Sequence, residues 1–518
     1  MSSNPGQARL WALGVLILLM LVTGFRLIGL DHLPVWHDEV FTLVRVFGHP
    51  ADLWETLFSG RLLTPDEILA FQRPDPSKGW EETLRALAEH PEHAPLYYLL
   101  GRWAATLPLD PVTALRGTSA AFGLLLPLGA FWLMRELFGR GLVPWVAAAV
   151  VAFSPLHLLY AQEARQYALW TLLVLTSSAG LQRALDRNRP RDWWLYGLMM
   201  TLGLYSHLLF ALMVPVHAAY IGLGATRFSE CRSGKRGLPV RAWLLAVSAA
   251  AVLFLPWMVA LVSGFGDAVG HTQWMERAVG AQRNLLAWAG HITRAFLDVG
   301  PHTDPPRLAL LLLGPIAVGL SVYLFRAPRP RMWLLVLIAA AYFGVALGPD
   351  LLLGGSRSLH VRYGLPAVLA AQLMVAWGIG SALARRDRTR VFAAAALALI
   401  MVFGALSQWR ILQAETWWTK HFSASNPEVA RLVNALDRPL VAVSPSGVAA
   451  GELVSLAYHL DDRVRIWGHG DPGVHVTLPD GFGSLVMLLP SAELGAAIGP
   501  ERVAEPIAGT WQWLLVRR

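Results

Sequence analysis

The feature that most constrains this chain is a series of long apolar runs separated by short polar segments. A membrane-spanning helix needs about 20 mostly apolar residues, and we find eleven runs near that length. They cover residues 10–30, 112–134, 142–159, 168–184, 193–205, 208–224, 243–262, 308–325, 332–353, 364–383 and 391–409. The sequence therefore predicts an all-α polytopic membrane protein with about eleven transmembrane helices.

Composition agrees with this class. Only 15% of the residues are charged, whereas about 25% is usual in soluble proteins. The net charge of +8 is attributed to arginine-rich cytoplasmic loops, not to binding of nucleic acid. The single cysteine, Cys231, excludes an intrachain disulfide. The first run is too long for the apolar region of a signal peptide, so we expect an uncleaved first helix.

The arginines of the polar segments predict an orientation. If residues 94–107 do not cross, all five basic loops lie on the cytoplasmic side, with the N-terminus. These loops are residues 135–140, 183–191, 227–241, 326–331 and 385–390. The stretch 94–107 is short and carries Arg102 at its centre, so we expect a helix at the outer interface. In a bacterium, the outside of this inner-membrane protein is the periplasm.

The chain changes character after about residue 410. Strand-like runs at 440–443, 464–467, 484–489 and 513–516 alternate with helix-like stretches at 427–436 and 447–459. This alternation predicts a small α/β domain, and neither a G-x-G-x-x-G nor a Walker pattern marks a nucleotide site in it. We divide the chain into a transmembrane domain at 1–410, with a periplasmic loop at 31–111, and a soluble periplasmic domain at 411–518.

Two acids open the first external loop. Asp38 and Glu39 follow Trp36 and His37 directly after the first apolar run. Adjacent carboxylates at a membrane surface are costly unless they are solvated, paired or bound to a metal. They are interpreted either as a general base assisted by a divalent cation or as acids of an ordinary first helical turn.

Glu163 and Arg165 occupy a second external turn, between Tyr160 and Tyr167. A carboxylate there can complete a metal site, and an arginine can grip a phosphate with two hydrogen bonds. The alternative is an interfacial salt bridge within an aromatic belt.

The predicted topology brings these groups together with others at one outer face. The ionisable set is Asp38, Glu39, His93, Glu163, Arg165, His207 and Arg362. Carboxylates and arginines at one bilayer surface suit a substrate with an anionic head and an apolar tail.

At these residues the sequence resembles the GT-C glycosyltransferases, specifically the protein O-mannosyltransferase-like family 39. The resemblance is carried, in order, by residues 36–39, 93–98, 160–168, 205–207 and 362–367. One departure is Ala94, where the family usually has a proline in a His-Pro-Pro run. The tail lies outside the match.

The resemblance implies a fold and a reaction. The fold is the GT-C type, and the donor is a polyprenyl phosphate–sugar. The acceptor is an envelope glycan such as lipopolysaccharide, a lipid or a protein. Asp38 is implied as the base, with Glu39 and Glu163 as supporting acids, and a divalent cation, Mg or Mn, is considered at Glu163 and Asp38. The implied substrate-binding residues are His93, Tyr97, Arg165, Tyr167, His207, Arg362 and Tyr363.

Two other functions stay open at this point. A transporter or lipid flippase would place charged groups near the bilayer midplane, often with inverted repeats. Here most ionisable groups fall in outer turns, and we find no internal repeat. A non-catalytic scaffold would use the tail to bind envelope partners and leave the acids of the loops inert.

Overall fold

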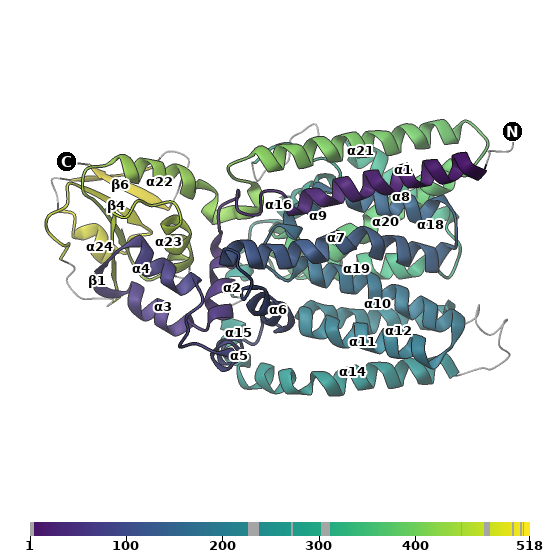
Figure 1. Cartoon of the computed structure of the whole chain (residues 1–518), viewed down its shortest axis with the longest axis horizontal. Coiled ribbons are helices and arrows are strands. Elements are labelled where there is room, and N and C mark those ends of the chain that lie inside the picture. The colour runs from purple at the N-terminus through teal and green to yellow at the C-terminus, as the bar shows by residue number, and fades with distance from the viewer. Residues whose placement is uncertain are drawn as a thin grey trace.

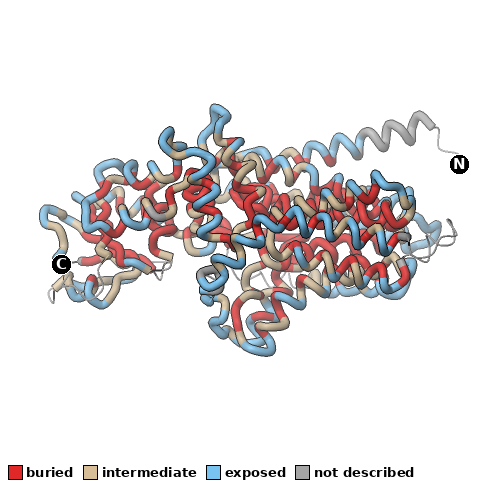
Figure 2. Tube along the Cα trace, turned by 90° about the horizontal axis from the view of Figure 1, so that it is seen from below, coloured by how far each residue is buried: buried red, intermediate tan, exposed pale blue. Residues whose placement is uncertain are grey.

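The computed structural model describes residues 5–225, 238–270, 273–301, 311–446, 448–470, 477–499, 502–507, 510 and 512–517. Cys231 and most of the basic loop 227–241 lie outside these residues. A bundle of long helices adjoins a smaller part built on a six-stranded sheet (Figure 1). Figure 2 shows buried residues in both parts, and one hydrophobic core runs from the bundle into the sheet.

Every predicted apolar run contains a helix in the described part of the chain. The helices are α1 (Pro5–Gly24), α7 (Pro111–Phe138), α8 (Leu142–Ala152), α9 (Pro155–Ala161), α10 (Tyr167–Arg187), α11 (Pro190–Ser206), α12 (Met213–Tyr220), α14 (Leu238–Ser263), α18 (Leu313–Arg326), α19 (Trp333–Leu352), α20 (Leu365–Leu383) and α21 (Thr389–Gln413). Among the described residues, five helices are long and apolar enough to cross a membrane, or six if the bent pair α8–α9 is one span. The number of about eleven spans stays a prediction.

A sharp bend between α8 and α9 positions the second external turn. The two helices meet at 60°, because Pro155 starts α9 and disfavours helical geometry at Ser154. The break leaves backbone carbonyls without a helical hydrogen-bond partner, and side chains that are remote in the sequence bond to them. Arg26 Nη2 donates to Val151 O at 3.1 Å. Gln408 Nε2 donates to Ala152 O at 2.9 Å. The helix break that precedes the turn of Glu163 and Arg165 is therefore held by side chains from remote segments.

Short helices lie between the bundle and the sheet (Figure 1). They are α2 (His37–Phe47), α3 (Pro50–Leu57), α4 (Pro65–Leu69), α5 (Trp80–Ala88), α6 (Leu96–Ala104), α15 (Phe265–Gly270) and α16 (Ala281–Arg294). The stretch 94–107 contains α6, which has nine residues. At about 1.5 Å per residue, this helix is too short to cross a hydrocarbon core of about 30 Å.

The tail folds as the expected alternation of strands and helices. It contains η8 (Trp418–Ser425), α22 (Asn426–Ala435), β2 (Pro439–Val443), α23 (Ala449–Ala457), β3 (Arg465–His469), β4 (Ser484–Leu488), α24 (Ala492–Ala496), β5 (Val503–Pro506) and β6 (Trp513–Arg517). The strand order is β1-β3-β2-β4-β6-β5. Strand β2 is parallel to β3 and β4, whereas β6 is antiparallel to β4 and β5.

One edge of this sheet does not come from the tail. Strand β1 (Ser59–Leu63) belongs to the first external loop and runs antiparallel to β3. Leu63 pairs with Ile466 in this register. The loop 31–111 and the tail therefore share one sheet, which no local pattern in the sequence indicated.

Candidate functional site

The first turn of α2 presents the two adjacent acids to different surroundings. Helix α2 begins at His37, and Glu39 caps it by accepting a hydrogen bond from Trp36 N at 3.3 Å. Because successive helical residues point about 100° apart, the side chains of Asp38 and Glu39 diverge. Glu39 is fully buried, whereas the side chain of Asp38 is 18% exposed.

Glu39 is surrounded by hydrogen-bond donors. Arg116 grips it with two bonds, Nε to Oε1 at 2.8 Å and Nη2 to Oε2 at 2.7 Å. Ala164 N donates at 2.7 Å and Lys420 Nζ at 3.0 Å. Burial opposes ionisation, but Arg116 and Lys420 outweigh it and lower the pKa of Glu39 to about 2. Glu39 therefore holds α2, α7, the second turn and the tail together as a carboxylate.

Asp38 pairs with an arginine from a segment that is remote in the sequence. Arg362 Nη1 lies 3.0 Å from Asp38 Oδ2. Burial raises the pKa of Asp38, but the charges of Arg362 and Arg165 outweigh it, so the net shift is downward. Asp38 is thus an ionised carboxylate that keeps some contact with solvent.

Arg165 donates hydrogen bonds to the same turn of α2. Its Nη1 donates to Asp38 O at 3.3 Å, to Thr42 Oγ1 at 3.1 Å and to Tyr98 OH at 3.3 Å. Its Nε is buried and has no hydrogen-bond partner among the described residues. The structure therefore brings Arg165 to the backbone of Asp38.

Glu163 lies beside this network without a strong partner. It is 1% exposed, and its Oε1 has no hydrogen-bond partner in the part of the chain that the structure describes. Burial raises the pKa of Glu163 to about 7, although the charge of Lys420 opposes this shift. Near neutral pH this carboxyl group can exchange a proton.

The sequence reasoning missed Lys420. It lies in η8 at the start of the tail, is 1% exposed and bonds to Glu39. A single lysine in a stretch outside the family resemblance gave no signal, because its role depends on how the tail folds back onto α2.

A cavity of about 260 Å³ opens beside the Asp38–Arg362 pair. Its lining combines arginines, histidines and aromatic rings: Trp36, Tyr160, Arg283, Leu286, Ala287, His291, Arg294, Leu359, His360, Val361, Arg362, Trp418, Thr419 and His421. No carboxylate is among these lining residues. Arg362 forms part of the wall, and its Nε is buried without a partner among the described residues. The cavity therefore favours an anion.

Of the remaining predicted residues, Tyr97 and His207 make contacts within the bundle, whereas His93 and Tyr363 lie near the arginines. Tyr97 OH is occupied, since it bonds to Leu115 O at 2.9 Å and to Ser119 Oγ at 2.8 Å. His207 stacks on Trp170 at 4.1 Å and lies 6.2 Å from the Tyr167 ring. His93 and Tyr363 lie closer to the arginines. The ring of His93 is 5.9 Å from that of Tyr98, and the ring of Tyr363 is 5.2 Å from Arg362 Cζ.

The residues present do not fit a metal site. Within the described ranges, no group of three or more His, Cys, Asp or Glu side chains is arranged to hold an ion. Of the two expected ligands, Asp38 pairs with Arg362, and Glu163 is flanked by the positive charge of Lys420. The divalent cation at Asp38 and Glu163 stays a prediction.

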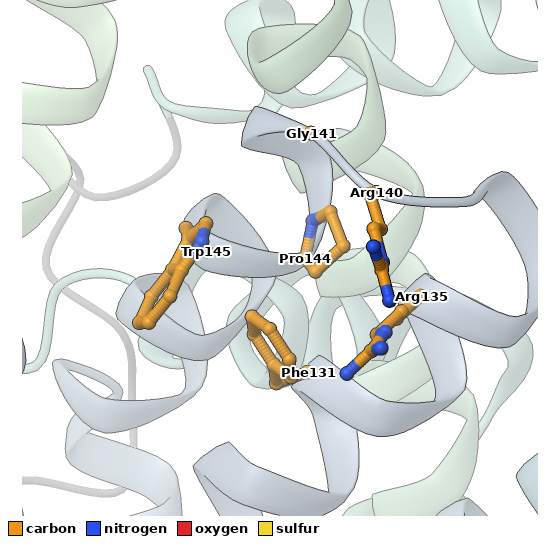
Figure 3. Close-up of a pocket in the computed structure, with 6 residues that line it drawn as sticks. All are labelled: Phe131, Arg135, Arg140, Gly141, Pro144 and Trp145. Carbon is orange, nitrogen blue, oxygen red and sulfur yellow. The ribbon is translucent and has the colours of Figure 1, made fainter. Parts of the chain in front are cut away.

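A second cavity lies elsewhere in the bundle, between the end of α7 and the start of α8. It is lined by Phe131, Arg135, Arg140, Gly141, Pro144 and Trp145 (Figure 3). None of the predicted site residues lines it. The candidate site is therefore the region around Asp38.

Comparison with known sequences supports the family resemblance. Residues 92–259 match the sequence model of the dolichyl-phosphate-mannose-protein mannosyltransferase family. Comparison with curated protein sequences found no significant match.

Solved structures share the fold at low identity. ArnT from Cupriavidus metallidurans in the apo state has a TM-score of 0.57 at 13% identity, covering 98% of this chain and 98% of that one. The same protein bound to undecaprenyl phosphate gives 0.51 at 15%, with 98% and 97% covered. The Archaeoglobus fulgidus oligosaccharyltransferase, tethered to an acceptor peptide with the NVT sequon, gives 0.50 at 13%, with 89% and 64% covered. The resemblance is confirmed in the fold shared with these solved structures and, over residues 92–259, in the match to the family model.

Proposed function

We propose that this chain, a membrane protein with the fold of GT-C glycosyltransferases, transfers a sugar from a polyprenyl-phosphate donor to an acceptor hydroxyl at the periplasmic face. The acceptor is an envelope glycan, a lipid or a protein, and Asp38 is the general base. One observation carries the proposal: Asp38 forms an ion pair, at 3.0 Å, with an arginine that lines a basic cavity.

The cavity supplies the phosphate site in this proposal. Arginine binds phosphate with parallel N–H donors, and the buried Nε of Arg362, which belongs to the cavity wall, has no partner among the described residues. Arg294 and Arg283 add positive charge to the wall or its rim. A protein with this fold has been solved with undecaprenyl phosphate, which supports a donor of this class.

The chemistry follows from these positions. Asp38 removes the proton of the acceptor hydroxyl while the acceptor oxygen attacks the anomeric carbon. The bond from that carbon to the phosphate oxygen breaks, and the lipid phosphate leaves with the electron pair. Arginines stabilise the charge that develops on the leaving oxygen more than they stabilise the ground state. Attack opposite the leaving group inverts the configuration, by analogy with inverting glycosidases.

The supporting residues have distinct tasks in this proposal. Glu39 positions α2, because all its strong contacts are structural and it has no exposed surface. Glu163 is the acid able to hold a proton near neutral pH. His93, Tyr167, His207 and Tyr363 provide rings around the sugar, while Tyr97 acts indirectly through Ser119, whose Oγ donates to Arg165 O at 3.0 Å.

The experiment uses the purified full chain in lipid nanodiscs with a panel of radiolabelled polyprenyl-phosphate sugars. We expect release of unlabelled lipid phosphate together with labelled acceptor when envelope extract is added. Asp38→Asn should abolish the release, whereas Asp31→Asn, an exposed acid of the same loop, should not. Movement of intact labelled lipid between leaflets in proteoliposomes, without release, would establish the flippase instead.

A further inference from the structure

The tail meets the start of α2 through a buried polar cluster. Helix α23 approaches so closely that a Cβ on Gly451 would lie 2.3 Å from His37 Nδ1. The next residue, Glu452, is fully buried. A tail residue thus touches the residue that directly precedes Asp38.

Glu452 is the centre of this cluster. Its Oε1 accepts a hydrogen bond from Ser423 Oγ at 2.8 Å. Its Oε2 lies 3.3 Å from Asn426 Nδ2 and 3.5 Å from Gln512 Nε2. These partners come from two stretches of the tail, residues 423–426 and Gln512, so the carboxyl group also ties the tail together.

Ser423 links Glu452 to the start of α2 through hydrogen bonds. Its Oγ accepts from His37 N at 3.1 Å, an N–H that the helix itself cannot satisfy because it lies in the first turn. A second bond holds the preceding segment, since Ser455 Oγ donates to Val35 O. The backbone on both sides of Trp36 is therefore fixed by the tail.

No arginine or lysine of the described residues lies within ion-pair distance of Glu452, and His37 Nδ1 lies 3.9 Å from its Oε1. The two amides beside Glu452 are held in place by further hydrogen bonds. Asn426 Nδ2 also donates to Ser455 Oγ at 2.8 Å, and Gln512 Nε2 donates to Phe422 O at 2.8 Å. Both amides therefore present N–H groups to the Glu452 carboxyl.

Burial raises the pKa of Glu452 to about 8, although the hydrogen bonds from Ser423 and Asn426 oppose this shift, and the negative charge of Asp38 adds to it. Burial lowers the pKa of His37 to about 4, so His37 offers no positive charge at neutral pH.

We propose that Glu452 is a positioning residue: as a buried acid of the tail, it fixes the first turn of α2 through Ser423 and thereby sets the direction of the Asp38 side chain. The inference rests on the proposed function, because it takes Asp38 as the base. It makes the tail a part of the site and not a separate binding module.

The test compares Glu452→Gln and Glu452→Ala in the full chain. Glutamine keeps a carbonyl oxygen that accepts from Ser423, so it should retain most of the activity. Alanine removes this acceptor, and kcat should fall about 100-fold, the order expected for a displacement of about 1 Å, while KM for the donor changes little. Glu428→Ala, an exposed acid in the first turn of α22, is the matched control.

Hydrogen–deuterium exchange of the peptide covering residues 36–42 gives a readout without substrate. Glu452→Ala should accelerate exchange in this peptide, whereas Glu452→Gln should not. If Glu452→Ala does not insert into the membrane, Ser423→Ala takes its place in the comparison. Unchanged exchange, or faster exchange with unchanged kcat, would overturn the inference, as would equal losses in both Glu452 variants. If the wild-type chain releases no lipid phosphate from any donor, the proposed function fails, and the exchange data alone decide whether Glu452 fixes α2.

Discussion

Asp38 and Arg362 form an ion pair of 3.0 Å although they belong to the first and the last of the segments that carry the family resemblance. The rings of Trp36, Trp274 and Tyr363 lie 5.3, 5.8 and 5.2 Å from the Arg362 Cζ atom. Cation–π attraction to these rings holds the Arg362 guanidinium in place. The pair couples the proposed base to the wall of the proposed phosphate cavity.

The first prediction concerns Asp38→Asn. Base catalysis typically contributes about 100- to 10,000-fold, so kcat should fall by that order while the protein still inserts and binds the donor. Initial rates of lipid phosphate release, with donor affinity measured separately, check this. Near-wild-type rates in the purified variant would remove Asp38 from its role.

The second prediction concerns the pH dependence of Arg362 variants. Because the charge of Arg362 opposes the effect of burial on the pKa of Asp38, Arg362→Gln should raise that pKa. Activity needs the carboxylate, so the acidic limb of the kcat/KM profile should move to higher pH. Arg362→Lys keeps the charge and should leave the limb in place, yet it should raise donor KM because lysine cannot bind bidentately. Identical profiles for Arg362→Gln and the wild type would contradict this coupling.

The third prediction concerns Glu163. Burial raises its folded pKa from 4.5 to about 7, so the folded protein binds this proton more tightly than the unfolded chain does. The stabilisation is complete below about pH 4.5 and is lost as pH rises through about 7. Glu163→Gln should therefore melt a few °C above the wild type at pH 8 and show less dependence on pH. A melting curve at each pH in the same detergent measures this difference, and equal pH dependence in both proteins would refute it.

The fourth prediction separates the structural roles of Glu39 and Lys420. Glu39→Gln leaves Arg116 and Lys420 buried without a counter-charge and should destabilise the protein by about 3–5 kcal/mol. Lys420→Met removes one charged hydrogen bond and leaves the Arg116 pair intact, so it should cost about 1.5–3 kcal/mol. Thermal or denaturant unfolding of both variants measures the ranking. A Glu39→Gln protein as stable as the wild type would show that the buried carboxylate is not what holds these segments.

The motifs predicted which residues meet, but not what each of them does. Asp38, Arg165 and Arg362 come together as the topology implied, and Glu163 lies beside them. The adjacent acids Asp38 and Glu39 nevertheless have opposite surroundings, because one helical step turns one of them toward the cavity and the other toward Arg116. The resemblance implied Asp38 as the base and Glu39 as a supporting acid of the same site, and their adjacency did not indicate that their surroundings differ.

Hydropathy and turn residues are local properties of a chain, so the membrane class, the helical runs and the series of motifs could be predicted from the amino-acid order. The partner of each charged group depends on the fold. It placed Lys420 and Glu452 of the tail against α2 and added β1 of the first loop to the sheet of the tail. Ion pairing and burial depend on distances between segments that are remote in sequence, and no spacing pattern within either segment carries that information.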